Sequence, residues 1–241
     1  MTGSRLVVSP PTSSRGGRPW VVGEWLIAAL LPHLCVGASP LATTERILDT
    51  ADWNPSNTTA VVQAALTGPV RRVVLRAAPG PWIVDPLLVA GDRELVIERG
   101  AVLEARRGGF QGMNDSLLTL RAVSNVALRG GGMLRMWGDD YRGANYRPSE
   151  WRHAIQLRGA VNICIEGLRI ERSGGDGIYV GAGPDREPCR DIVVRDVVCD
   201  AHHRQGISVI SVAGLRLERV VLQGTRGTPP QAGLDVEPNH P

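Results

Sequence analysis

Several acidic, imidazole and guanidinium side chains lie close to short apolar stretches in the second half of the chain. The most reactive of them are Asp176, Tyr179, the run His202-His203-Arg204, Asp235 and Glu237. Imidazole, carboxyl and phenol groups transfer protons, so this set suits general acid–base catalysis. Guanidinium forks bind carboxylates, and a base near C5 of a uronate can abstract its proton. Together these residue types indicate chemistry on an acidic sugar chain.

The elements that position these residues repeat along the sequence. One phrase, a small residue followed by apolar, variable and apolar residues, begins at Ala154, Gly177, Gly206 and Gly233. A second apolar phrase begins at Asn125, Asn162, Asp191 and Gly214. The period of two predicts strands, and no helical period intervenes. Two strand types that recur every 23 to 29 residues predict a solenoid of strands and turns, which is an all-β parallel β-helix.

Stacked coils would place the variable positions above one another. Because side chains alternate across a strand, the variable positions would form one outward column: Gln156, Tyr179, Ser208 and Asp235. Glu237 shares the face of Asp235, two residues earlier. The turns before these strands contribute Arg152, His153, Asp176, His202, His203, Arg204 and Gln205. Neighbouring strands lie about 4.8 Å apart, so we expect all these side chains to line one groove.

We assign the groove residues two expected roles. The predicted catalytic residues are Asp176, Tyr179, His202, His203 and Arg204. The predicted substrate-binding residues are Arg152, His153, Gln156, Gln205, Ser208, Asp235 and Glu237. Asp235 and Glu237 are also candidate Ca²⁺ ligands, because calcium prefers oxygen donors, although no calcium-loop spacing occurs. The alternatives are structural: Asp176 as a turn residue between glycines, and the histidines and acidic groups as solvated surface.

The first part of the chain differs in composition from the repeats. Residues 1–38 combine a basic start, an apolar run and a small-residue exit, which predicts a secretory signal peptide, with a disordered leader as the alternative. The protein would then be secreted or periplasmic, and the apolar run is too short for a stable membrane span. In residues 39–68, Asn57-Thr58-Thr59 before an apolar segment predicts a short helix that caps the solenoid.

The coils are expected over residues 69–241. The chain ends directly after a column strand, so we expect a C-terminal truncation. Without the leader, the net charge of +3 falls to about +1, and no basic stripe indicates nucleic acid as a partner. Three cysteines outside the leader lack a C-x-x-C spacing, so no zinc site is predicted. We expect a monomer.

The order of capping helix, Val-Val-Leu strand, Pro-Gly turn and repeated coils resembles the pectate-lyase-like superfamily of right-handed parallel β-helices. The phrases that carry the resemblance are Gly174-Gly175-Asp176-Gly177-Ile178, Arg204-Gln205-Gly206-Ile207-Ser208-Val209 and Gly233-Leu234-Asp235-Val236-Glu237. They are similar to exported bacterial right-handed β-helix repeat proteins, which are grouped with polysaccharide lyases, epimerases and glycoside hydrolases. Neither the paired-aspartate signature of polygalacturonase-type hydrolases nor the Tyr-Gly-x-Asp-Pro-His phrase of alginate epimerases occurs here.

Three functions are therefore open. The leading one is β-elimination or epimerisation at a uronate of an acidic polysaccharide, with a histidine, Arg204 or Tyr179 as base and acid. The second is glycoside hydrolysis that uses the carboxylates of Asp176, Asp235 and Glu237. The third is a non-catalytic surface protein that only binds carbohydrate. Because one fold hosts many activities, the choice rests on the geometry of the site.

Overall fold

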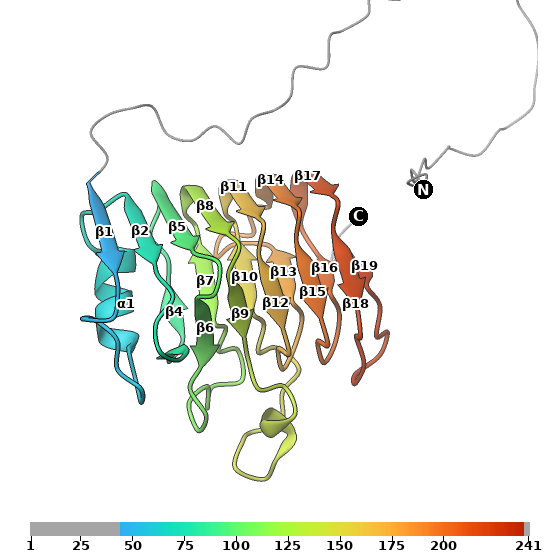
Figure 1. Ribbon diagram of the computed structural model, residues 1–241. Helices are drawn as coiled ribbons and strands as arrows, with labels where there is room; N and C mark the ends of the chain where they lie inside the picture. The colour runs from blue at the N-terminus through green and yellow to red at the C-terminus, as the bar shows by residue number, and fades with distance from the viewer. Residues whose placement is uncertain (1–43, 239–241) are drawn as a thin grey trace, which may run out of the picture. The chain divides into compact units, whose positions relative to one another are not determined.

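The computed structural model describes residues 44–238. The predicted leader, the first five residues of the predicted cap and the last three residues of the chain lie outside the described residues. In the part described, three sheets wrap around one core, and the chain passes through each sheet once per coil (Figure 1). This is the predicted solenoid of strands and turns.

Within residues 44–238, each sheet is parallel throughout, and hydrogen-bonded neighbours come from successive coils. Sheet A has the order β1 (Glu45–Leu48), β2 (Arg72–Leu75), β5 (Arg93–Ile97), β8 (Ser124–Gly130), β11 (Val161–Glu166), β14 (Cys189–Arg195) and β17 (Val212–Glu218). Sheet B has the order β3 (Trp82–Val84), β6 (Val102–Ala105), β9 (Met133–Arg135), β12 (Arg169–Glu171), β15 (Val198–Asp200) and β18 (Val221–Gln223). Sheet C has the order β4 (Leu87–Leu88), β7 (Leu118–Arg121), β10 (Ile155–Arg158), β13 (Ile178–Gly181), β16 (Ile207–Val209) and β19 (Leu234–Val236).

The core consists of inward side chains that stack from coil to coil. Ile155, Ile178 and Ile207 lie in register in sheet C, and all three are fully buried. In sheet B, Cys199 stacks on Ile170 and is equally buried. Burial raises the pKa of the Cys199 thiol to about 12, because the apolar core disfavours a thiolate. Cys199 therefore acts as a small apolar core residue, as its place in the repeat predicts.

Strands β8 and β11 of sheet A each have a residue in the left-handed backbone region at their second position, just after the short turn from sheet C. Asn125 and Asn162 have φ values of 59° and 54°, a conformation that asparagine tolerates better than most residues. Their side chains also join neighbouring coils, because Asn162 Nδ2 donates to Asn125 Oδ1 at 2.7 Å and Asn125 Nδ2 donates to Asp92 Oδ1 at 2.9 Å. These asparagines join neighbouring coils near the start of the sheet A strands and lie on the outside of the coils.

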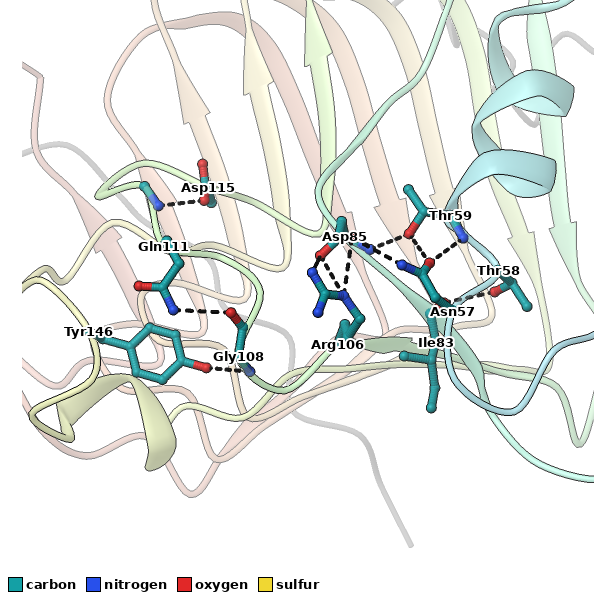
Figure 2. Close-up of polar contacts among 11 residues, drawn as sticks. Asn57, Thr58, Thr59, Ile83, Asp85, Arg106, Gly108, Gln111, Asp115 and Tyr146 are labelled. Carbon is teal, nitrogen blue, oxygen red and sulfur yellow. Dashed lines mark hydrogen bonds and ion pairs between the residues drawn. The ribbon is translucent and has the colours of Figure 1, made fainter.

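The predicted cap contains the expected helix and one element that the sequence did not indicate. Helix α1 (Thr59–Thr67) ends at Gly68, and Asn57 Oδ1 accepts a hydrogen bond from the Thr59 backbone N–H at 2.8 Å (Figure 2). Strand β1 precedes the helix and pairs with β2. Its four residues carry one fully buried side chain, Leu48, which is too short a pattern to identify a strand.

The turns between sheets B and C are the longest, and they carry the charged residues discussed below. After β9 the chain makes an excursion, residues 136–154, which contains the 3₁₀ helix η1 (Asp140–Arg142) and extends away from the sheets (Figure 1). Trp137 Nε1 donates to the Ala105 carbonyl at 2.8 Å and ties the excursion to the preceding coil. No helix in residues 44–238 has the length and hydrophobicity needed to span a membrane.

Candidate functional site

The predicted outward column exists in the expected register. Tyr179 on β13 pairs with Gln156 on β10 and with Ser208 on β16, and Ser208 pairs with Asp235 on β19. The pairing continues beyond Asp235, because the Glu237 N–H donates to the Val209 carbonyl at 3.0 Å. Stacked parallel strands therefore place Gln156 and Glu237, which are 81 positions apart in the sequence, along one column of the same sheet.

Most of this column is covered. Gln156 and Ser208 have only 4% and 0% of their surface exposed, and His153, Asp176 and Gln205 in the adjoining turns are equally buried. Tyr179 and Asp235 are half-buried, whereas 15% of the Arg204 side chain and 62% of the Glu237 side chain are exposed. The groups that a polymer can touch are therefore Tyr179, Arg204, Asp235 and Glu237, which we call the column face.

A buried carboxylate lies behind the column face. Asp176 Oδ1 accepts a hydrogen bond from the Gln205 backbone N–H at 3.1 Å, and Oδ2 lies 3.2 Å from His153 Nδ1. His153 Nδ1 also accepts a hydrogen bond from the Asp176 backbone N–H at 3.0 Å. Among the described residues, Asp176 Oδ2 has no hydrogen-bond donor, and its charge is balanced by Arg204 Nη1 at 3.7 Å. A buried carboxylate needs such a partner to remain ionised.

Arg204 and Gln205 connect this buried carboxylate to the two exposed ones. Arg204 lies between Asp176 and Glu237, with an Nη–O distance of 3.7 Å to each. Gln205 Nε2 donates to Asp235 Oδ2 at 3.1 Å. The turn between β15 and β16 therefore orients both acidic side chains of the column face. Asp176 contacts Arg204 and does not itself reach the surface, so its geometry fits a positioning residue, and its predicted catalytic role stays a prediction.

Tyr179 is the aromatic part of the column face. Burial raises the pKa of its phenol above the ordinary value, since the surroundings disfavour the phenolate, and the nearby Arg158 opposes that shift. At neutral pH the hydroxyl therefore keeps its proton. It can donate a hydrogen bond to a sugar oxygen, but it is poorly suited to act as a base.

Two predicted site residues lie away from the column face. The His202 ring is fully buried, its Nδ1 lies 2.8 Å from Ser173 Oγ, and desolvation lowers its pKa to about 4. Arg152 is also fully buried, and its guanidinium donates to the carbonyls of Phe110 at 2.8 Å and Arg147 at 2.9 Å. Both side chains are covered in this structure, and so are His153, Gln156, Gln205 and Ser208. The predicted catalytic role of His202 and the predicted binding roles of the other five residues stay predictions.

His203 faces a different region from the residues beside it in sequence. Its Nε2 lies 3.2 Å from Thr228 Oγ1, and its ring lines two adjoining hollows under the excursion. The first, of about 290 Å³, is lined by Gly138, Asp139, Arg142, Glu171, Arg172, Ser173, Asp200, Ala201, His203 and Arg226. The second, of about 630 Å³, is lined by Tyr141, Arg142, Gly143, Ala144, Tyr146, Pro148, Ser149, Glu150, His203 and Thr228. We call them the arginine hollow and the tyrosine hollow.

Sequence reasoning missed both hollows. The signals that pointed to them were the polar last residues of the sheet B strands, such as Glu171 and Asp200, and the aromatic content of the excursion. Those residues do not belong to the repeated Gly-Ile-x-Val phrase, so the repeat does not predict that they lie together.

The described residues contain no group of three or more histidine, cysteine or acidic side chains arranged to hold a metal ion. Asp235 and Glu237 interact with Gln205 and Arg204 respectively. Asp200 lies in sheet B, where its carboxylate accepts hydrogen bonds from Arg169 and Gln223. Asp200 therefore lies in a different sheet from Asp235.

Comparison with curated proteins finds uncharacterised relatives. The chain is 26% identical over 172 residues to the SPbeta prophage-derived uncharacterized protein YorA of Bacillus subtilis (strain 168), which covers 65% of this chain and 28% of YorA. It is 23% identical over 195 residues to the uncharacterized protein YclG of the same organism, covering 77% of this chain and 32% of YclG. The chain thus spans about a third or less of the curated relatives it matches. It matches no protein-family model.

Comparison with solved structures establishes the fold. The chain superposes on a putative glycosyl hydrolase from Parabacteroides merdae ATCC 43184 with a TM-score of 0.59 and 15% identity, covering 80% of this chain and 94% of that one. An iota-carrageenase in complex with iota-carrageenan fragments superposes with a TM-score of 0.56 and 12% identity, covering 74% of this chain and 42% of that one. The polygalacturonase of Erwinia carotovora ssp. carotovora superposes with a TM-score of 0.51 and 13% identity, covering 76% of this chain and 64% of that one. The fold is the right-handed parallel β-helix of these proteins, as the resemblance to the pectate-lyase-like superfamily implies.

Proposed function

We propose that the protein acts on a polysaccharide and hydrolyses it at the column face, with Asp235 and Glu237 as the catalytic carboxylates. The observation that carries this proposal is that both carboxylates are accessible on one side of the last described coil and are oriented from behind by Arg204 and Gln205. Three structural neighbours, described as a glycosyl hydrolase, a carrageenase and a polygalacturonase, support polysaccharide as the substrate class.

Hydrolysis needs one carboxyl group to protonate the leaving glycosidic oxygen and another to activate water or to form a glycosyl intermediate. Residues two apart on an extended strand have side chains on the same face. In this proposal Asp235 and Glu237 would therefore both face the sugar and supply the two carboxyl groups. Tyr179 would lie beside the sugar and donate a hydrogen bond from its protonated hydroxyl.

The burial of His153 and His202 argues against β-elimination or epimerisation as the reaction. Those reactions need a base that reaches C5 of a uronate. His202 and His153 are covered, His203 lies in the hollows, and the raised pKa of Tyr179 keeps it protonated. Of the predicted bases, Tyr179 and Arg204 belong to the column face, and Arg204 already interacts with two carboxylates.

The experiment compares products from polygalacturonate, iota-carrageenan and a neutral galactan. We expect new reducing ends without absorbance from unsaturated sugars, and we expect Asp235→Asn and Glu237→Gln each to abolish them. Arg190→Gln, an exposed change on β14, serves as the matched control and should retain full activity. Unsaturated products that disappear in Arg204→Gln would instead establish a lyase. Binding without any product would establish a carbohydrate-binding protein.

Two further parts of the proposal concern the conditions of action. We propose that the protein acts outside the cytoplasm as a monomer; cell fractionation and the mass of the particle in solution test this. An alternative role proposed for Asp235 and Glu237, in place of acid and base, is calcium binding, because carboxylate oxygens are the donors that calcium prefers. Adding a calcium chelator to the assay should then reduce turnover, and Asp235→Asn should remove the calcium-dependent increase in thermal stability.

A further inference from the structure

The arginine hollow and the tyrosine hollow adjoin, because Arg142 and His203 line both. Together they form one trough between the excursion and the turns that follow the sheet B strands. None of the four residues of the column face lines the trough. The trough is therefore a concave surface separate from the column face, and its residues take no part in the proposed cleavage.

The acidic side chains of the arginine hollow are already paired. Glu171 accepts hydrogen bonds from Arg135 at 3.4 Å and from Arg169, and Arg169 also donates to Asp200. Neither of these two arginines lines the hollow. Their charges therefore offset the carboxylates of the wall before any ligand enters.

The arginines that line the hollow make fewer ion pairs than Arg169 does. Arg142 pairs with Asp139, but Arg172 lies 3.9 Å from the same carboxylate, at the limit of an ion pair. The guanidinium of Arg226 has no ion-pair partner within residues 44–238, and the backbone N–H of Arg226 donates to the His202 carbonyl at 3.0 Å. Three arginines and three acidic side chains line the hollow, and Glu171 and Asp200 are also paired with Arg169 from outside it. Arg172 and Arg226 therefore have the least ion pairing of the lining guanidinium groups and are the ones available to an anion.

The tyrosine hollow adds a fixed aromatic ring. Tyr146 Oη accepts a hydrogen bond from the Gly108 backbone N–H at 2.8 Å, and Gln111 Nε2 donates to the Gly108 carbonyl at 3.1 Å (Figure 2). The Tyr146 ring packs edge-on against Tyr141, with 5.1 Å between ring centroids. An anchored ring beside cationic side chains offers a surface for the apolar face of a sugar next to a site for its charged group.

We propose that the trough is an accessory binding site for an anionic sugar chain, with a carboxylate or sulfate group bound by Arg172 and Arg226 and a neighbouring sugar ring stacked on Tyr146. The volume of the arginine hollow, about 290 Å³, lies at the lower end of small-molecule sites. The site binds and does not cleave. It rests on the proposed substrate class but needs no turnover, so it can be tested separately.

The test measures calorimetric binding of three probes to the full chain: an oligogalacturonate, its methyl ester and an iota-carrageenan oligosaccharide. All binding is measured in a Glu237→Gln background, in which the probes should not be cleaved. We expect the oligogalacturonate to bind, and Arg172→Gln and Arg226→Gln each to weaken it roughly tenfold. The matched control Arg190→Gln should bind as the parent protein does. The methyl ester, which has the same rings without the charges, should bind weakly to every variant.

The aromatic half of the trough is tested with two changes at one position. Tyr146→Phe keeps the ring and should retain affinity, whereas Tyr146→Ala should weaken binding of the oligogalacturonate roughly tenfold. The carrageenan probe decides whether sulfate replaces carboxylate, because tighter binding of that probe with the same arginine dependence assigns the site to sulfated sugars.

The proposal is overturned if the double variant Arg172→Gln/Arg226→Gln binds both anionic probes as tightly as its parent, or if the methyl ester binds equally well. Turnover is followed separately with Glu237 intact. Loss of binding in the arginine variants with no cleavage in any protein would leave the trough standing and refute hydrolysis. Cleavage of the substrate together with unchanged binding in the arginine variants would support hydrolysis and refute the proposed binding site in the trough.

Discussion

The imidazole of His153 and the phenol ring of Tyr179 stack, with 4.7 Å between their centroids and 20° between their planes. His153 belongs to the turn before β10 and Tyr179 to β13, so the stack joins two successive coils. It also explains why His153 is covered although it precedes a column strand. Asp176 lies 3.2 Å from His153 and 3.7 Å from Arg204, so it links the stacked rings to Arg204. The aromatic and charged parts of the column face are therefore one connected unit.

Tyr179→Ala should lower the free energy of unfolding by about 1–2 kcal/mol, because it removes both the stacked ring and its partial burial. Tyr179→Phe keeps the ring and should stay within about 0.5 kcal/mol of the parent protein. Urea unfolding followed by circular dichroism measures both values. Equal unfolding midpoints for the alanine and phenylalanine variants would show that the stack does not stabilise the coils.

Arg93 should be important for the capping helix. Its buried guanidinium donates to the carbonyl of Ala65 at 2.7 Å and to that of Gly68 at 2.8 Å, which satisfies acceptors at the end of α1. Arg93→Gln should destabilise the protein by about 1–3 kcal/mol, because buried acceptors lose a charged donor. The exposed Arg99→Gln, six residues later, is the control and should be neutral. Amide exchange should show that residues of α1 open first in Arg93→Gln.

The outer face of sheet A carries alternating charges. Glu166 contacts Arg195 at 2.9 Å and Arg129 at 3.8 Å, and Arg72 contacts Glu45 at 2.7 Å and Glu94 at 2.8 Å. These groups are partly exposed, so Glu166→Gln should cost no more than about 1 kcal/mol at low salt and less at high salt. Thermal unfolding at two salt concentrations measures the difference. A loss that does not change with salt would mean that Glu166 stabilises through packing.

The sequence predicted the fold because a repeated phrase constrains each coil in the same way. The register of Gln156, Tyr179, Ser208 and Asp235 follows directly from that repeat. Strand β1 could not be predicted in this way, since it has four residues and lies outside the repeat. The repeat also aligns Cys199 with Ile170, and both are buried in the core.

The site was predictable only in part, because a repeat says which face a residue occupies but not what covers it. Gln156 and Ser208 face outward and are nevertheless buried. His202 and His203 are adjacent in a turn, where alternation does not apply, and they face different surroundings: Ser173 in one case and Thr228 in the other. The residues that line the trough come from four separate segments, and only the three-dimensional structure brings them together.

His202 should make the stability of the protein depend on pH. Desolvation lowers its pKa to about 4, whereas an unfolded histidine titrates near 6.5. Between these two values the unfolded chain binds a proton that the native protein does not, so stability should fall as the pH decreases from about 6.5 to about 4. A single group of this kind contributes a slope of up to about 1.4 kcal/mol per pH unit.

Urea unfolding at several pH values should show this slope in the wild type and a smaller one in His202→Asn. The neighbouring His203→Gln is the matched control. Burial also lowers the pKa of His203, but its ring is less buried than that of His202, so His203→Gln should retain most of the slope. Nuclear magnetic resonance of the wild type gives a second reading that does not require a folded variant. A His202 ring signal that titrates near the ordinary histidine pKa would contradict the assignment of this ring to the dry interior.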